Sequence, residues 1–339
     1  MGTLTPRERV RAALSHEEPD RVPMDLGATY ASGIIQGAYQ RLCAYLGLSP
    51  PMHAPAGRSA TASIDEEVLR RLQVDCRGIT PNTPDLWTTH NADGTQTDGW
   101  GVTWGRPPGG HFYVVKPPLA GEPALADVER LPIPDPDDPQ ITDGLQESVS
   151  RLRAAGDYAI CLNLPSRLVH QIEFQRGYAE ALVDLVSNPT LAEALMERIT
   201  EFNVRAACRV LDLIGNEVDV VCIGDDLGTQ NGPFVNPRTY RALIKPRQRR
   251  LTEAIRRRTN AFLFYHSCGS VVDLIPDLID LGVQVLNPVQ VSAAGMDPER
   301  LKREFGKHLA FWGAVDTHRV LPRGTPSEVE DKVRQLLDR

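Results

Sequence analysis

The sequence predicts a (β/α)8 barrel, an α/β fold in which eight parallel strands alternate with helices. Seven short apolar runs are separated by stretches in which apolar residues recur at helical spacing, and this alternation is typical of a parallel α/β sheet. Several runs lack alternating polar residues, as expected when both faces of a parallel strand are covered. The length of 339 residues also fits one barrel.

We expect a strand at each apolar run and a helix after most of them. The expected strands are residues 22–27, 74–79, 158–164, 218–224, 261–266, 283–290 and 309–315. The expected helices are residues 6–16, 189–214, 237–258, 271–281 and 327–337. In residues 189–214, Leu191, Leu195 and Ile199 recur at helical spacing, and we interpret such stripes as core-facing.

No apolar run of the sequence corresponds to an eighth strand. After the seventh apolar run only the helix at residues 327–337 is predicted. A closed barrel needs eight strands, because an open parallel edge leaves backbone donors and acceptors unpaired. We therefore expect the chain to be truncated after Arg339, and we take residues 1–339 as one barrel domain.

Residues 91–118 interrupt the alternation with glycine, proline and aromatic residues. Asp93 and Gly94 form a dipeptide that favours a tight turn between strands, so we expect a β-hairpin inserted in the barrel. The proline-rich residues 131–139 predict an extended connector on the surface.

Composition excludes several functional classes. The net charge of -7 offers nucleic acid no broad basic surface. The chain has neither a secretion signal nor an apolar run long enough to cross a bilayer, which predicts a cytoplasmic protein without membrane association. The six scattered cysteines do not form a disulfide framework, and a reducing compartment would keep them as thiols. The oligomeric state stays open, with a homodimer among the alternatives.

His266 and Cys268 are the predicted metal ligands. They stand two residues apart at the end of an expected strand, so both side chains point to the same side of the barrel mouth. Zinc accepts imidazole nitrogen and thiolate together, and Gly269 lets the backbone approach closely. A catalytic zinc site usually has three protein ligands. The third remains open between Asp316, His318 and the missing C-terminal segment.

Asp225 and Asp226 follow the fourth expected strand and should lie on the same face. We expect at least one of them to contact the substrate or transfer a proton. The other would cap the loop or bind a backbone amide.

Amide and carboxylate groups near other strand ends are predicted to bind the substrate. Asn287 and Gln290 would form polar walls of the site, and Asp316 stands at the end of the seventh strand. His170, Glu173 and Gln175 follow the third strand, where a helix-capping or core role is at least as well supported as substrate contact.

Five motifs together resemble the uroporphyrinogen decarboxylase superfamily. They are residues 5–10, 18–23, 224–230, 265–270 and 311–316. The resemblance implies a barrel of that type and one of two chemistries. One arm removes carboxylates from a porphyrinogen without a cofactor, and the other comprises zinc methyltransferases that work with corrinoid proteins.

The resemblance favours the methyltransferase arm. The decarboxylase arm carries an arginine-rich stretch after residues 18–23, whereas this chain has no arginine between Arg21 and Arg41 and would lack those carboxylate clamps. The methyltransferase arm carries its zinc ligands in a His-x-Cys motif, which His266 and Cys268 match. Its third ligand is typically a cysteine near the eighth strand.

The leading hypothesis is a zinc-dependent methyltransferase of the O-demethylase type. It would move a methyl group from a methoxylated or methylated small molecule to or from a corrinoid (cobalamin) carried by a partner protein that docks at the barrel mouth. The alternatives are a uroporphyrinogen decarboxylase and a non-catalytic ligand-binding barrel.

Overall fold

The computed structural model describes residues 3–49, 58, 61–83, 87–108 and 110–338. Six strands in this part of the chain form one parallel sheet with the spatial order β1-β6-β7-β8-β9-β10, and no backbone pairing links its two end strands. Neighbouring strands follow one another along the chain, as in an α/β barrel. The strands are β1 (Cys76–Ile79), β6 (Ala159–Asn163), β7 (Val220–Gly224), β8 (Phe262–His266), β9 (Val285–Asn287) and β10 (Ala310–Phe311).

The prediction of a strand at residues 22–27 is wrong. The Met24 carbonyl accepts from the Asp75 N–H (2.9 Å), but the Met24 N–H donates to the Asp75 side chain (2.7 Å) rather than to a backbone carbonyl. Asp25 then closes a turn by accepting from the Ala28 N–H (3.0 Å). Side-chain oxygens compete with the ladder here, so the apolar run does not become a strand.

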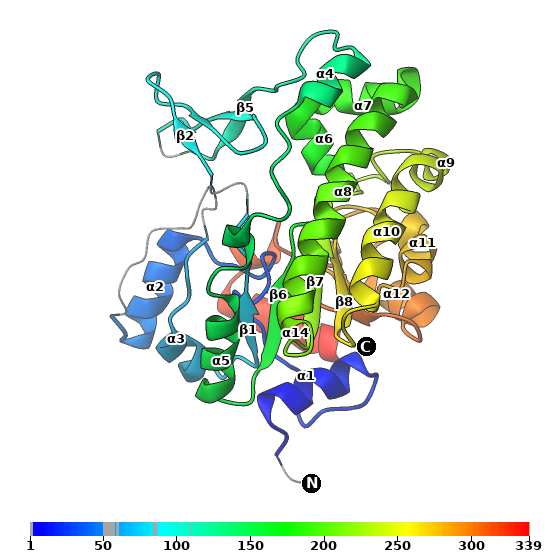
Figure 1. The fold of residues 1–339 in the computed structure, drawn as a ribbon. Helices are drawn as coiled ribbons and strands as arrows, with labels where there is room; N and C mark the ends of the chain where they lie inside the picture. Colours follow the sequence, from blue (N-terminus) through cyan, green and yellow to red (C-terminus); the bar gives the residue numbers. More distant parts are fainter. Residues whose placement is uncertain (1–2, 50–57, 59–60, 84–86, 109, 339) are drawn as a thin grey trace.

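The barrel interior is filled mainly by small side chains. Cys76 of β1, Cys161 of β6 and Cys222 of β7 are all buried there, because alternate residues of a strand face the same side. Val10 and Leu14 of α1 (Pro6–Leu14) join this cluster. Figure 1 shows α1 lying across the lower end of the strands, where it closes the barrel floor.

Helices cover the outside of the sheet. Helix α8 (Pro189–Ile214) has the predicted bounds, and Figure 1 shows α10 (Lys245–Arg256) beside it. The predicted helix at residues 237–258 is divided by a π-helical turn, η3 (Tyr240–Ile244), that follows α9 (Pro237–Thr239). No helix of the described chain combines the length and apolar character needed to span a membrane. The other helices are α2 (Gln36–Leu46), α3 (Glu66–Arg71), α4 (Leu125–Arg130), α5 (Leu145–Ala155), α6 (Val169–Arg176), α7 (Tyr178–Ser187), α11 (Ile275–Asp280), α12 (Pro298–Phe305), α13 (Val320–Arg323) and α14 (Pro326–Leu337).

The predicted hairpin at residues 91–118 is part of a larger, four-stranded antiparallel sheet. Its strands pair in chain order and stand apart from the barrel strands in Figure 1. Gly94, at φ 82°, lies in the predicted turn. A second turn forms because the buried Asp98 carboxylate accepts from the Trp100 and Val102 N–H groups and from the Trp104 indole. The strands are β2 (Thr89–His90), β3 (Gln96–Thr97), β4 (Thr103–Gly105) and β5 (Tyr113–Lys116).

Candidate metal centre

Polar side chains gather at the carboxyl ends of three neighbouring strands. In the register of the sheet, Gly224 of β7 lies beside His266 of β8, and His266 lies beside Asn287 of β9. Residues that follow Gly224 and His266 therefore meet at the same edge. The predicted site residues that the structure brings together here are Asp225, Asp226, His266, Cys268 and Asn287.

Three donor atoms converge at this edge. The His266 Nε2 atom lies 3.5 Å from the Cys268 Sγ atom and 3.5 Å from the Asp226 Oδ1 atom. The ligand atoms of the three residues all lie within 4.8 Å of one another. Three atoms that can bind a metal, one nitrogen, one sulfur and one carboxylate oxygen, therefore surround one point. We call His266, Cys268 and Asp226 the donor group.

Asn287 fixes which ring nitrogen of His266 faces that point. The Asn287 Nδ2 atom donates to the Trp312 carbonyl (2.8 Å), which leaves the Oδ1 atom to accept from His266 Nδ1 (2.6 Å). The proton is thus assigned to Nδ1, and Nε2 faces Asp226 and Cys268. A hydrogen bond to the ring nitrogen that does not bind the metal commonly orients the histidine ligands of metals.

Glycine at position 269 lets two loops pack backbone to backbone. Gly269 has φ 81°, and a Cβ atom there would lie 2.2 Å from the Gly228 carbonyl oxygen. Next to it, the Ser270 N–H donates to the Thr229 carbonyl (2.7 Å). This contact holds the loop after β7 against the loop after β8, and so fixes Asp226 relative to Cys268.

Asp225 points away from the three donors and holds a helix. Its carboxylate accepts from the N–H groups of Leu168, Val169 and His170 at the start of α6, and from the His170 Nδ1 atom (2.7 Å). A carboxylate is favourable there because helix N–H groups lack intrahelical partners. The two adjacent aspartates thus differ in position, one at the donor group and one under α6.

Asp226 and His266 form an ion pair. Burial disfavours the charged imidazole, but hydrogen bonds with Asp226, Cys268 and Asn287 outweigh it and raise the pKa of His266 to about 10. Burial also opposes the charged Asp226 carboxylate, yet hydrogen bonds with His266 and the Cys268 N–H lower its pKa to about 2. A metal ion at Nε2 would take the place of a proton there.

Two predicted substrate contacts lie outside the donor group. The Gln290 Oε1 atom accepts from the Gly269 N–H (2.8 Å), so this amide supports the loop that carries Cys268. Asp316 accepts from the N–H groups of His318 (2.7 Å) and Arg319 (3.0 Å) and caps a turn. His318 is exposed and lies 3.4 Å from the Ser292 hydroxyl, so among the described residues neither Asp316 nor His318 joins the group of His266, Cys268 and Asp226.

Two further residues adjoin the donors. The Tyr30 ring stands edge-on to the His266 ring, with 5.6 Å between the ring centroids. The His170 Nε2 atom lies 3.8 Å from the Asp226 Oδ2 atom. Tyr30 has no signal in the sequence, because it comes from a loop far away in the chain. His170 follows a strand, and only its pairing with Asp225 distinguishes it from an ordinary helix residue.

His266 and Cys268 fit zinc. Imidazole nitrogen and thiolate sulfur are ligands that zinc combines in proteins. Because Nδ1 is bonded to Asn287, Nε2 is the ring nitrogen that lies on the side of Cys268. Both side chains are partly exposed, so an ion and a further ligand can reach them from the barrel mouth.

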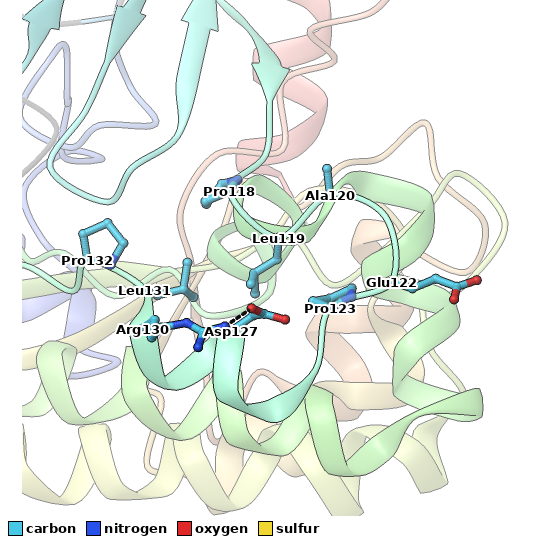
Figure 2. A pocket seen from close by; sticks show the side chains of 9 residues that line it. All are labelled: Pro118, Leu119, Ala120, Glu122, Pro123, Asp127, Arg130, Leu131 and Pro132. Atoms are coloured by element: carbon cyan, nitrogen blue, oxygen red, sulfur yellow. Dashed lines mark hydrogen bonds and ion pairs between the residues drawn. The ribbon is translucent and has the colours of Figure 1, made fainter.

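A separate hollow of about 420 Å³ lies beside α4 and contains none of the predicted site residues. Figure 2 shows proline, leucine and alanine side chains among its lining, together with Glu122 and the paired Asp127 and Arg130 (2.5 Å). The hollow brings together no imidazole or thiol and so offers less chemistry than the cluster at the strand ends.

Comparisons with known proteins agree with this fold. The chain resembles a solved methyltransferase from Methanosarcina mazei with a TM-score of 0.62 and 17% identity, over 99% of this chain and 90% of that one. At this identity the likeness concerns the fold alone. No curated protein matches the sequence. The family model for uroporphyrinogen decarboxylase (URO-D) matches residues 109–339, more than half of the sequence. The chain therefore belongs to the uroporphyrinogen decarboxylase family.

Proposed function

We propose that this chain is a zinc-dependent methyltransferase, which moves a methyl group between a methoxylated or methylated small molecule and a corrinoid protein. The observation that carries the proposal is the pairing of His266 Nε2 with Cys268 Sγ (3.5 Å) at the carboxyl edge of the sheet. Barrel enzymes place their chemistry at this edge. The name of the structural neighbour, a methyltransferase, supports the same reaction class.

Zinc at this position would supply Lewis acidity, which lowers the pKa of a thiol or polarises an ether oxygen. The chain's own residues hold and shape the site. Asn287 keeps the imidazole in the tautomer that offers Nε2. Tyr30, with 45% of its surface exposed, presents an aromatic wall beside His266, against which an apolar methylated substrate would pack.

The methyl group would pass to or from the cobalt of a separate corrinoid protein that docks at the barrel mouth. Because Co(I) is a strong reductant, it requires reducing surroundings. We therefore assign the reaction to the cytoplasm, where the free cysteines of the chain would also stay reduced.

Porphyrinogen decarboxylation suits this site less well. Arg21, which precedes the segment that lacks arginine, is bound to Asp75 (2.7 and 2.9 Å) beside the first strand. The carboxylates of Asp225, Asp226 and Glu173 lie near one another and would repel a polycarboxylate substrate. A non-catalytic barrel would not require an imidazole oriented toward a thiol.

The test combines metal analysis with a methyl-transfer assay. Purified protein should contain stoichiometric zinc and should methylate free cob(I)alamin from a methoxyphenol, as followed by the cobalamin absorbance. His266→Ala and Cys268→Ala should lose both properties. His318→Ala and Cys208→Ala, which change residues of the same types outside the site, should keep both.

Contrary results would decide between the alternatives. Metal-independent decarboxylation of uroporphyrinogen would replace the proposal with the decarboxylase reading. Protein that binds no zinc and turns over neither substrate would favour the ligand-binding barrel.

A further inference from the structure

The His-x-Cys motif supplies two ligands, whereas catalytic zinc sites usually have three protein ligands and one open position. Within the described residues, the structure leaves few candidates for the third protein ligand. Asp316 caps a turn, and His318 is exposed beside Ser292. Cys222 is fully buried in the interior cluster. Among the residues that the structure describes, Asp226 alone joins His266 and Cys268 in a group with metal-ligand spacing.

We propose that Asp226 is the third metal ligand, so that the site is complete within this chain. The inference deepens the proposed function and rests on it, because it presupposes a metal at His266 and Cys268. One thiolate, one carboxylate and one neutral imidazole balance the charge of a divalent cation. Such balance matters at a partly buried site, since an uncompensated charge there is costly.

The Asp226 carboxylate is held from two sides. Its Oδ1 atom accepts from the Cys268 N–H (2.8 Å), so the carboxylate is tied to the loop of another ligand. Its Oδ2 atom faces the His170 Nε2 atom (3.8 Å), while Asp225 holds the other nitrogen of that ring (2.7 Å). Asp225 and His170 are thus positioning residues for Asp226. The carboxylate already faces the donors and needs no loop rearrangement to bind a metal.

The group also leaves room for a fourth ligand. The side chain of Asp226 is 28% exposed and that of His266 is 17% exposed, so one side of the group faces the barrel mouth. A substrate atom can approach from that side, which is the arrangement of a catalytic rather than a structural zinc site.

The test reads the ligands directly in the cobalt(II)-substituted protein. Its thiolate-to-cobalt charge-transfer band reports how many thiolates bind, and a competing chromophoric chelator gives the affinity. Asp226→Asn keeps the size and the acceptor for the Cys268 N–H but removes the negative charge. It should weaken zinc binding at least about tenfold. Asp226→Cys should strengthen the charge-transfer band by adding a second thiolate.

Asp316→Asn and Asp316→Cys are the matched controls and should leave affinity and band intensity unchanged. Wild-type zinc affinity in Asp226→Asn together with an unchanged band in Asp226→Cys would overturn the assignment. The proposed function would then stand, because it depends on His266 and Cys268. A wild-type protein that binds no metal would overturn both.

Discussion

The side-chain amide of Asn287 determines which ring nitrogen of His266 faces Asp226 and Cys268. Asn287 donates to the Trp312 carbonyl and accepts from His266, so it acts through the imidazole rather than on a substrate. The sequence predicts this amide as a polar wall of the substrate site, and the structure adds that it holds the imidazole of His266.

Asn287→Ala should therefore lower zinc affinity without removing a ligand. Loss of such a support typically reduces metal affinity about 10- to 100-fold, and we expect a value in that range. Competition with a chelator measures it. Asn231→Ala removes an exposed amide in the loop after β7 and serves as control. Equal affinities for the two variants would contradict this role of Asn287.

The buried side chain of Glu173 affects how the stability of the protein depends on pH. It is 7% exposed, and burial together with the nearby Asp225 and Asp226 raises its pKa to about 7, although His170 acts in the opposite direction. The folded protein therefore holds a proton that the unfolded chain releases near pH 4 to 5. Stability attached to this group is present at low pH and is lost as the pH rises toward 7.

Glu173→Gln should consequently stabilise the protein at pH 8 relative to the wild type, by up to about 3 kcal/mol, and much less at pH 5. Urea unfolding at the two pH values measures the difference. Glu180→Gln changes an exposed glutamate on α7 and should show no such pH dependence. A gain for Glu173→Gln that is equal at both pH values would contradict the raised pKa.

The sequence predicted part of the site and missed part for a physical reason. His266 and Cys268 are two residues apart, so local strand geometry places them together. For Asp225 and Asp226 the sequence predicts only that at least one contacts the substrate or transfers a proton, because the place of Asp226 beside His266 depends on the register between β7 and β8. Tyr30 reaches the site from a distant loop. Contacts across strands and loops are not encoded in local spacing.

At the scale of elements, ion pairs of its arginine side chains hold α1 against the amino ends of the strands. Thr5 and Glu8 form a capping box at its start. Arg7 binds Asp219 (2.8 Å), and Arg9 binds Asp75 (2.7 Å). Thr5, Arg7, Glu8 and Arg9 belong to the motif at residues 5–10, and their contacts lie at the end of the strands opposite the candidate metal centre. This part of the family signature is therefore structural.

Asp219→Asn should destabilise the protein by about 1.5 to 3 kcal/mol, because it replaces hydrogen bonds from partly exposed arginines to a buried carboxylate by weaker bonds to a neutral amide. Asp219 is fully buried and also accepts from Arg153 (3.0 Å) and the Ile160 N–H (3.0 Å). The shift of the urea midpoint measures the effect. Asp212→Asn breaks an exposed pair with Arg258 and should cost no more than about 0.5 kcal/mol.

The same carboxylate predicts acid sensitivity. Burial opposes its charge, but hydrogen bonds from Arg7, Ile160 and Arg153 prevail and lower the pKa of Asp219. Because the folded pKa lies below the unfolded value, this stability is present above about pH 4 and is lost as the pH falls. Asp219→Asn should therefore flatten the pH dependence of stability on the acid side.

Most strands of the parallel sheet are predicted correctly from the sequence. Six of the seven apolar runs contain strands of the parallel sheet, and α8 has the predicted bounds. Residues 22–27 do not form a strand because Asp75 takes the Met24 N–H. The inserted sheet has more strands than expected because buried Asp98 stabilises a second turn. In both cases a side-chain carboxylate that accepts from backbone N–H groups determines the local structure, which hydrophobic patterning does not reveal.

At the scale of the whole molecule, the two ends of the sheet have different tasks. The amino ends are closed by α1 and its ion pairs, while the carboxyl ends carry the donor group and open outward. The (β/α)8 prediction agrees with the order of the six strands and with the structural likeness. Because the stabilising contacts and the donor group lie at opposite ends of the strands, the loops after the strands can vary in sequence without weakening the contacts of α1.

The cysteines differ in accessibility, so the labelling of one thiol can serve as an internal reference for the labelling of another. Of the six cysteines, four are buried and only Cys208 and Cys268 are partly accessible, and burial raises the pKa of Cys208. Iodoacetamide should therefore carboxamidomethylate Cys268 first, and peptide mass spectrometry would locate the adduct. Added zinc should protect Cys268 and leave the slow labelling of Cys208 unchanged. Loss of that contrast would mean that the thiol lies away from the metal.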